Sequence, residues 1–441
     1  MNFWQKAAST TVSIRRVKRD GDTVKVHLIG IGGAGMAPLA ELLLQRNVAV
    51  SGSDIEFNSK CASLQAAGAQ IFTGHRKENF APDVTTVVFT SAAAADNPEL
   101  LAAQEHGVPC FRRGEYLAEF AKNYRRVISV SGTHGKSSIS ALIASILSEC
   151  GKAPGFMIGA QVAGMPSCSN GKYDDLFVTE ADESDGTHTA LKNFIGVVPN
   201  VEDDHSWSLG GKAVLEKNFR TFAANSEILL YYASEECDRL FADHPHAVRL
   251  EKMPEEFAGL RGFQAANSFI ACQAALLAGC DETAALAAAA NYPQVKRRMT
   301  LHHASQHVTV IEDYAHHPTE VEKSIELLRL NYPGKHLTVI FQPHRYARLE
   351  RYFDGFVSAL RKADKLVVVP VFAAWCESGK VGGAELAAAA NGEYFAGKWQ
   401  EIAGQIFTEL PESGGVIAVL GAGDVEKLIA PLIEQLSGTA L

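Results

Sequence analysis

The residues of this chain best suited to chemistry are glycines, a lysine and serines that follow an apolar run. Residues 127–131 read Val-Ile-Ser-Val-Ser, and residues 132–138 read Gly-Thr-His-Gly-Lys-Ser-Ser. Glycine backbone and a helix N-terminus can surround an anion, the ammonium of Lys136 adds a point charge, and the hydroxyl of Ser137 can meet a metal ion. Val130 stands where the longer G-x-x-x-x-G-K-[ST] pattern has its first glycine. These residues predict a phosphate-binding loop of a shortened type.

Two acidic groups follow later apolar runs. Residues 180–185 read Glu-Ala-Asp-Glu-Ser-Asp, and residues 202–205 read Glu-Asp-Asp-His. Carboxylates are the hard oxygen ligands that Mg²⁺ prefers. For either group alone a solvated acidic loop is an equal alternative, and His205 by itself is more often a structural or surface residue. Beside a phosphate-binding loop, two such groups at strand ends indicate a metal-phosphate site.

A second glycine-rich segment lies near the N-terminus. Residues 30–36 read Gly-Ile-Gly-Gly-Ala-Gly-Met, between a predicted strand and a predicted helix, and Asp54 follows after another apolar run. The pattern G-x-G-x-x-G with a later acid is typical of a dinucleotide site. Three interpretations stay open at this point: a nicotinamide cofactor, another ligand containing a diphosphate, and a tight strand–helix turn without a ligand.

Histidines and arginines gather in the last third of the chain. Residues 313–318 read Asp-Tyr-Ala-His-His-Pro, residues 342–348 read Gln-Pro-His-Arg-Tyr-Ala-Arg, and residues 296–298 read Lys-Arg-Arg. Two arginines three positions apart, with histidines, can clamp a carboxylate or a transferring phosphoryl group. Surface charge is the alternative for any one cluster.

The elements that position these residues follow from alternating apolar runs and helical segments. Runs of four to six apolar residues before helical periodicity predict parallel sheets of βαβ units. We therefore predict an α/β fold with three domains after an N-terminal extension. The predicted boundaries are 1–23 for the extension, 24–124, 125–293 and 294–441 for the domains.

Composition narrows the class of protein. A chain of 441 residues is too long for one core, and its net charge of −9 argues against a nucleic acid or a polyanionic membrane as the main partner. The eight cysteines form no C-x-x-C pair, which favours a reducing compartment over a zinc site. No apolar stretch is long enough for a membrane span, and residues 1–23 lack the apolar segment of a secretion signal. We expect a cytosolic protein.

Taken together, the motifs resemble the Mur ligase family over about Val26 to Val425. Besides the segments quoted above, the matching elements are Ser51-Gly52-Ser53-Asp54, Gly74-His75, Asp96-Asn97-Pro98-Glu99 and Gly421-Ala422-Gly423-Asp424. The resemblance implies a Rossmann-like N-terminal domain for a UDP-sugar, a central P-loop ATPase-like domain for ATP, and a Rossmann-like C-terminal domain that closes over an amino acid. The first glycine loop would then hold a UDP diphosphate instead of a nicotinamide cofactor.

The same resemblance implies the reaction. We expect ATP-dependent ligation of L-alanine to the lactyl carboxylate of UDP-N-acetylmuramate through an acyl phosphate, with Mg²⁺, in peptidoglycan precursor synthesis. The partners would be these small molecules, with no nucleic acid and no membrane insertion, and the chain would act as a monomer or homodimer. Three alternatives remain: a recycling ligase that adds a preformed peptide, a catalytically silent UDP-sugar-binding relative, and a nicotinamide dehydrogenase.

Roles for individual residues also come from the resemblance. The UDP-sugar would contact Gly32, Gly33, Ala34, Gly35, Met36, Ser53, Asp54, His75 and Ser91. ATP would contact Gly132, Thr133, His134, Gly135, Lys136, Ser137, Ser138, Asn267, Arg298 and Asp313. Mg²⁺ would be held by Ser137, Glu180 and His205, and the amino-acid pocket would be lined by Tyr314, His316, His344, Arg345 and Arg348. The catalytic set would be Lys136, Glu180, His205, His316, Arg345 and Arg348.

Two departures from the family pattern accompany these assignments. Ser137-Ser138 replaces the usual Thr-Thr and keeps the hydroxyl. Phe263-Gln264 replaces the usual His-Asn ahead of Asn267, which bears on the adenine side of the ATP site.

Overall fold

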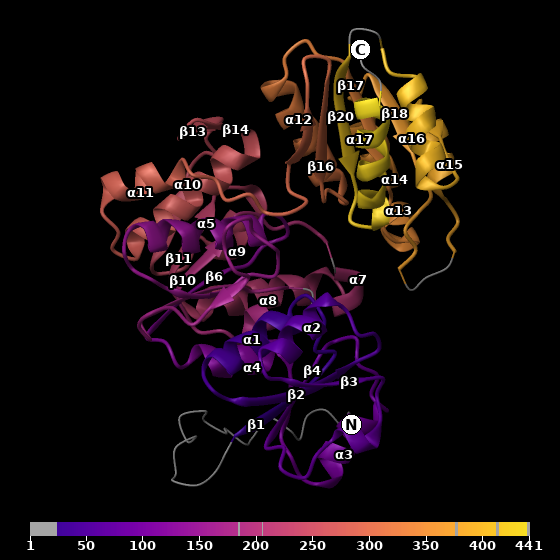
Figure 1. The fold of residues 1–441 in the computed structure, drawn as a ribbon. Coiled ribbons are helices and arrows are strands. Elements are labelled where there is room, and N and C mark those ends of the chain that lie inside the picture. The colour runs from indigo at the N-terminus through magenta and orange to yellow at the C-terminus, as the bar shows by residue number, and fades with distance from the viewer. Residues whose placement is uncertain (1–23, 184–185, 205, 375–377, 412–413, 439–441) are drawn as a thin grey trace. The chain divides into compact units, whose positions relative to one another are not determined.

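A computed structural model describes residues 24–183, 186–204, 206–374, 378–411 and 414–438 (Figure 1). The chain divides into two compact units. Unit 1 consists of the residues up to 253 together with 267–293, and unit 2 consists of 254–266 and the residues from 294 onwards.

Unit 1 begins with a parallel sheet of five strands in the order β3-β2-β1-β4-β5. The strands are β1 (Lys25–Ile29), β2 (Ala49–Asp54), β3 (Gln70–Thr73), β4 (Thr86–Phe89) and β5 (Cys110–Arg112). Because β1 lies between β2 and β4, the strand order reverses beside it. In such sheets ligands bind at the carboxyl ends of the strands at that reversal. The first glycine loop follows β1 directly and therefore lies at this point.

Local sequence signals start the helices around this sheet. The helices are α1 (Met36–Gln45), α2 (Ser59–Ala66), α3 (Pro98–Glu105), α4 (Arg113–Ala121) and the 3₁₀ turn η3 (Lys77–Asn79). The side chain of Asn58 accepts hydrogen bonds from the first turn of α2, and that of Asn97 does the same for α3, where Pro98 takes the first position. Such caps satisfy backbone donors that a helix leaves free at its start.

The second sheet of unit 1 has seven strands in the order β12-β11-β10-β6-β9-β7-β8. They are β6 (Arg126–Val130), β7 (Gly155–Met157), β8 (Cys168–Ser169), β9 (Leu176–Glu180), β10 (Asn193–Val198), β11 (Ser226–Tyr232) and β12 (Ala247–Leu250). The helices of this part are α5 (Lys136–Glu149), α6 (Thr187–Ala190), α7 (Ser206–Leu209), α8 (Lys212–Ala224), α9 (Glu235–Phe241), α10 (Gly262–Leu277) and α11 (Glu282–Ala289). Strand β6 lies between β9 and β10, so the phosphate loop that follows β6 has both acid-bearing strand ends beside it.

Unit 2 is built on six strands in the order β15-β16-β20-β17-β18-β19. They are β15 (Thr300–Ala304), β16 (Val308–Asp313), β17 (Leu337–Phe341), β18 (Lys365–Val368), β19 (Glu393–Tyr394) and β20 (Gly415–Leu420). One core packs α12 (Pro318–Asn331), α14 (Phe353–Leu360) and α15 (Gly383–Ala389) against the sheet. In a second core, α16 (Trp399–Thr408), η4 (Asp424–Leu428) and α17 (Ile429–Gly438) pack against the same sheet. Helices α16 and α17 are drawn in yellow tones in Figure 1.

The predicted α/β fold class is confirmed, with one correction. The prediction of purely parallel sheets is wrong at two edges, because β8 runs antiparallel to β7 and β15 runs antiparallel to β16. Both edge strands connect to their neighbours without a crossover helix, and strands joined in this way pair antiparallel. A two-stranded hairpin, β13 (Glu256–Phe257) with β14 (Leu260–Arg261), was also not predicted. The domain boundaries at 124 and 294 stay predictions. In the described part of the chain, no helix combines the length and the apolarity that a bilayer span requires.

Candidate active site

The phosphate loop of unit 1 joins β6 to α5, and both of its glycines have no room for a side chain. Gly132 has φ +132° and Gly135 has φ +88°, in the region that favours glycine. A Cβ at Gly132 would lie 2.8 Å from the carbonyl oxygen of Asn200, and one at Gly135 would lie 3.2 Å from Asn267 Oδ1. The structure therefore places Asn267 against the loop, and its contact with ATP stays a prediction.

Asn200 holds the loop from the neighbouring strand. Its Oδ1 accepts the N–H of His134 at 2.8 Å, its Nδ2 donates to the carbonyl of His134 at 3.1 Å, and its own carbonyl accepts the N–H of Thr133 at 3.3 Å. The sequence interpretation missed this residue. Its signal was its position just after β10, whose carboxyl end adjoins that of β6.

Lys136, the first residue of α5, lies in the loop with its side chain 16% exposed. Its Nζ donates to the carbonyl oxygens of Gly132 at 2.7 Å and Thr133 at 3.3 Å, and it pairs with Glu183 at 2.9 Å. Burial opposes the charge, but Glu183 and the neighbouring carboxylates outweigh it and raise the pKa of Lys136. The lysine therefore carries a fixed positive charge where a phosphate would lie. Glu183 is the partner that the sequence interpretation did not single out.

Ser137 and Glu180 meet at the ends of α5 and β9. Ser137 Oγ donates to Glu180 Oε2 at 2.9 Å, and the other carboxylate oxygen accepts the N–H of Gly159 at 2.7 Å. Burial raises the pKa of Glu180, and the hydrogen bonds from Gly159 and Ser137 and the charge of Lys136 offset this effect only in part. A buried carboxylate beside a hydroxyl is a donor set that suits a hard divalent cation. His205, the third predicted ligand, lies outside the described residues.

The first glycine loop, after β1, is closed by its own backbone and by Asp54. The N–H groups of Gly30 and Ile31 both donate to the carbonyl of Ser53, at 2.8 and 3.0 Å. Asp54 accepts the N–H of Gly32 at 2.8 Å with one carboxylate oxygen and the N–H of Ile55 at 2.8 Å with the other. Each oxygen of this acid thus already accepts a backbone hydrogen bond that shapes the loop, a use that the dinucleotide pattern did not indicate.

Arg113 places a positive charge beside this loop. A Cβ at Gly35 would lie 3.1 Å from both Nε and Nη1 of Arg113, so the arginine occupies the space that this glycine leaves. Its Nη2 also donates to Thr187 Oγ1 at 3.4 Å. The sequence interpretation missed Arg113, since it lies at the start of α4 outside every motif that was singled out.

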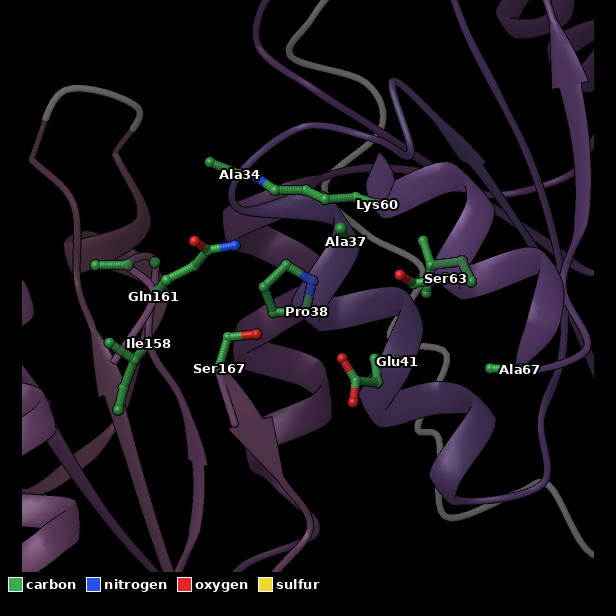
Figure 2. A pocket seen from close by; sticks show the side chains of 13 residues that line it. Ala34, Ala37, Pro38, Glu41, Lys60, Ser63, Ala67, Ile158, Gln161 and Ser167 are labelled. Atoms are coloured by element: carbon green, nitrogen blue, oxygen red, sulfur yellow. The ribbon is translucent and has the colours of Figure 1, made fainter. Parts of the chain in front are cut away.

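A cavity of about 280 Å³ lies between the first glycine loop and the loop after β7. Figure 2 shows helices α1 and α2 on one side, with Glu41 and Lys60, and Gln161 approaching from the opposite side. The lining includes Ala34 of the glycine loop at one end and Gly159, whose N–H binds Glu180, at the other. The cavity is therefore bordered by the first glycine loop and by the backbone group that binds Glu180.

The remaining predicted residues of this part lie around the same strand ends. Ser53, the residue before the last one of β2, hydrogen-bonds His75 Nδ1 at 2.9 Å, which brings these two together. Ser91 is exposed in the loop after β4, and Met36 is buried at the start of α1. Ser138 is buried in the first turn of α5.

In unit 2, Asp313 and two arginines contact the residues at the carboxyl end of β16. Asp313 accepts the N–H of Met299 at 2.8 Å and that of Ala315 at 2.9 Å, so its carboxylate shapes the turn in which it lies. Burial raises its pKa to about 6. The ring of Tyr314 has the guanidinium carbons of Arg297 and Arg298 at 5.0 and 5.1 Å from its centre. Cations at this distance interact favourably with an aromatic face.

The predicted amino-acid pocket is assembled from residues far apart in the chain. The rings of His316 and His344 lie 5.8 Å apart, that of Tyr314 lies 5.3 Å from His316, and Arg348 Nη1 lies 3.4 Å from His344 Nδ1. Burial, followed by the charges of neighbouring basic groups, lowers the pKa of His344 to about 3, so this histidine is neutral. Arg345 precedes α13 (Tyr346–Arg351) with φ +70°, a conformation that is costly for a residue with a side chain.

Comparison with known proteins shows the family of this chain. Residues 25–125 match the model "Mur ligase family, catalytic domain", and residues 297–423 match "Mur ligase, glutamate ligase domain". The chain is 33% identical over 94% of its length to the UDP-N-acetylmuramate–L-alanine ligase of Aquifex aeolicus, of which 98% is covered. It is 34% identical over 94% of its length to the enzyme of that name from Saccharopolyspora erythraea, also covered to 94%. The crystal structure of the UDP-N-acetylmuramate–alanine ligase of Thermotoga maritima matches with a TM-score of 0.76 at 24% identity, over 94% of this chain and 99% of that one.

Proposed function

This chain belongs to the Mur ligase family, and we infer from that membership that it is an ATP-dependent ligase joining L-alanine to UDP-N-acetylmuramate. The observation that carries the catalytic part is the contact of Ser137 with Glu180 beside the ammonium of Lys136. A fixed cation, a hydroxyl and a carboxylate at neighbouring strand ends are what a nucleoside triphosphate with a divalent cation requires. The two curated relatives described above are named UDP-N-acetylmuramate–L-alanine ligase. Their names favour L-alanine ligation over the recycling ligase, the silent UDP-sugar-binding relative and the nicotinamide dehydrogenase.

We propose that the first glycine loop holds the UDP-sugar. The N-terminus of α1 and the guanidinium of Arg113 beside Gly35 supply positive charge for a diphosphate. The remaining contacts would come from Gly32, Gly33, Ala34, Met36, Ser53, His75 and Ser91. The cavity in Figure 2 is lined by Ala34 and also by Gly159, whose N–H binds Glu180, and the muramyl sugar would extend along it toward the phosphates.

ATP would bind across the phosphate loop of unit 1. Lys136 is placed for the transferring phosphate, and backbone N–H groups of residues 132–138 would surround the others. Asn267, which lies against Gly135 and donates to Tyr292 at 3.4 Å, would contact the nucleotide on the other side of the loop. Contacts of Arg298 and Asp313 with ATP stay predictions.

Mg²⁺ fits the donors that are present. Ser137 and Glu180 would hold it, with His205 as a further predicted ligand. The positive charge of the cation would offset the effect of burial, which raises the pKa of Glu180. When bound, Mg²⁺ supplies charge neutralisation for the phosphates of ATP.

The ligation needs two steps, because a carboxylate oxygen is a poor leaving group at neutral pH. In the first step a lactyl carboxylate oxygen forms a bond to the γ-phosphorus of ATP, the bond from that phosphorus to the bridging oxygen breaks, and ADP leaves. In the second step the amine of L-alanine attacks the acyl carbon, the bond to the phosphate oxygen breaks, and phosphate and a proton are released. Lys136, Arg345 and Arg348 would stabilise the negative charge that develops.

The amino-acid pocket would lie among the aromatic and basic side chains of unit 2. Because His344 is neutral, Arg345 and Arg348 would provide the positive charge for the carboxylate of L-alanine. Tyr314 and His316 would line the pocket beside them. A cytosolic location and a monomeric or homodimeric state stay predictions.

Phosphate release measured with UDP-N-acetylmuramate and each amino acid in turn tests the function. We expect Mg²⁺-dependent turnover with L-alanine, reduced at least about a hundredfold in Lys136→Ala, because a charge that stabilises the phosphoryl group is lost. Lys152→Ala is the matched control, since this lysine lies just beyond the opposite end of α5, and its turnover should stay within about twofold of wild type. Absence of turnover with every amino acid, or an equal loss in both variants, would contradict the proposal.

A further inference from the structure

Glu99 is a fully buried carboxylate in the first turn of α3, and each of its recorded hydrogen-bond partners is a donor. Its Oε2 accepts the N–H of His27 Nε2 at 2.8 Å and the hydroxyl of Ser53 at 2.6 Å. Its Oε1 accepts the backbone N–H of Arg76 at 3.1 Å and the side-chain amide of Asn79 at 2.8 Å. The two N–H groups at Oε1 can only donate, and when Glu99 is ionised His27 and Ser53 must donate to Oε2 as well.

The charge state agrees with that geometry. Burial alone would raise the pKa of Glu99, but hydrogen bonds from His27, Ser53 and Asn79 outweigh it and bring the pKa to about 2. A carboxylate ionised at physiological pH imposes a direction on each hydrogen bond around it, because it can only accept.

That direction determines the tautomer of His75. The single hydroxyl proton of Ser53 points to Glu99, so Ser53 Oγ can only accept from His75 Nδ1, which lies 2.9 Å away. Nδ1 of His75 therefore carries a proton, and in the neutral ring Nε2 carries a lone pair. Among the described residues Nε2 of His75 has no hydrogen-bond partner, and the side chain is 22% exposed.

His27 provides an internal comparison with the opposite tautomer. Its Nε2 donates to Glu99, so its Nδ1 accepts the hydroxyl proton of Ser51 at 2.9 Å. His27 and Ser51 are completely buried, with no free ring nitrogen. One carboxylate thus orders two serine–histidine pairs, and only the pair with His75 reaches the surface.

The exposed pair lies at the proposed UDP-sugar loop. The carbonyl of Ser53 accepts the N–H groups of Gly30 and Ile31 in the glycine loop, and the carbonyl of Asp54 accepts the N–H of Gly74 at 2.7 Å. Ser53 therefore contacts the glycine loop through its carbonyl oxygen and His75 through its side-chain oxygen.

We propose that Glu99 is a positioning residue for the UDP-sugar: acting through Ser53, it fixes His75 with the proton on Nδ1 so that the Nε2 lone pair accepts a hydrogen bond from an N–H or O–H group of the uridine. This inference rests on the proposed function for the identity of the ligand. The tautomer itself is a property of the free protein. Ser53→Ala removes the hydrogen-bonded connection and leaves only the longer approach of His75 Nδ1 to Glu99 Oε1, at 3.4 Å. Ser51→Ala is the matched control, because both serines lie buried on β2 and each is bonded to one histidine.

The experiment combines histidine ¹⁵N spectra with steady-state kinetics. We expect the wild-type spectrum to show the proton of neutral His75 on Nδ1, and Ser53→Ala to shift it toward Nε2, whereas Ser51→Ala leaves it in place. The KM for UDP-N-acetylmuramate should rise about tenfold in Ser53→Ala with kcat nearly constant, and change less than twofold in Ser51→Ala. Comparing the affinities of UDP and its N3-methyl derivative tells the imide N–H from the ribose hydroxyls.

A double-mutant cycle with His75→Ala separates relayed from direct effects. If Ser53 acts through His75, Ser53→Ala adds nothing in the His75→Ala background. Additive effects, equal KM changes in the two serine variants, or a wild-type His75 with its proton on Nε2 would overturn the inference. The spectra require no turnover, so a failed activity assay with the predicted tautomer would count against the proposed function and not against the role of Glu99.

Discussion

Ser137 and Glu180, which are 43 residues apart in the sequence, share a hydrogen bond of 2.9 Å at the carboxyl ends of the adjacent strands β6 and β9. Ser137 reaches this point as the second residue of α5, and Glu180 as the last residue of β9. Because the two strands run parallel, their ends present both side chains at one edge of the sheet. These two side chains are the proposed Mg²⁺ ligands, so substitutions at them test whether the reaction depends on a metal ion.

Removing the hydroxyl of Ser137 tests the proposed cation site. We expect Ser137→Ala to raise the Mg²⁺ concentration for half-maximal phosphate release about tenfold, whereas Ser137→Thr keeps the hydroxyl and stays near wild type. Ser140→Ala is the control on the same helix, because Ser140 Oγ is buried without a hydrogen-bond partner among the described residues. Its turnover should stay within about twofold of wild type. Equal Mg²⁺ dependence of Ser137→Ala and wild type would contradict the assignment.

Gly135→Ala tests the left-handed backbone of the phosphate loop. Alanine at φ +88° costs about 1 to 2 kcal/mol, and its Cβ would also press against Asn267. Gly151 has φ +75° after the other end of α5 with no atom within 4 Å, so Gly151→Ala carries the conformational cost alone. We expect similar shifts of the urea midpoint in both variants, but a KM for ATP raised at least about tenfold only in Gly135→Ala. An unchanged KM there would mean that the loop does not bind the nucleotide.

The buried charge of Glu99 predicts a loss of stability in acid. Its pKa in the folded protein, about 2, lies below the ordinary value of 4.5, so the stabilisation is complete above pH 4.5 and lost as the pH falls toward 2. The full effect is about 3 kcal/mol. Glutamine at position 99 offers one acceptor to partners that all donate, so Glu99→Gln should be less stable at neutral pH. Urea titrations should show this difference shrinking between pH 4.5 and 2, and a constant difference would show that the charge is not responsible.

Arg348 and Arg351 offer a matched pair on α13 for the amino-acid pocket. Arg348 is 3% exposed and contacts His344, whereas Arg351 is exposed. Lysine lacks the planar fork that binds a carboxylate with two hydrogen bonds. We expect Arg348→Lys to raise the KM for L-alanine at least about tenfold with little change in the KM for ATP, and Arg351→Lys to stay within about twofold. If both variants bind L-alanine as well as wild type does, Arg348 has no part in the pocket.

Lys136, Ser137 and Glu180 could be predicted from the sequence because their signals are local. A glycine turn between an apolar run and a helix specifies a phosphate loop by spacing, and an acid directly after an apolar run marks a strand end. The α/β class follows from the same alternation. Edge strands β8 and β15 escaped prediction because the direction of a short strand depends on its connection and not on its composition.

The partners of these residues were decided by the tertiary structure. Asn200 and Glu183 reach the phosphate loop only because β10 and β9 lie on either side of β6, and no local spacing encodes that order. Arg113 lies beside Gly35, although most of the sequence of the first sheet separates the two residues. Glu99 becomes an ionised acceptor only because the folded chain surrounds it with hydrogen-bond donors. The sequence by itself determined which groups stand at strand ends, because backbone geometry is set by near neighbours. Charge, tautomer and contact were determined by burial and strand order, which depend on residues far apart in the chain.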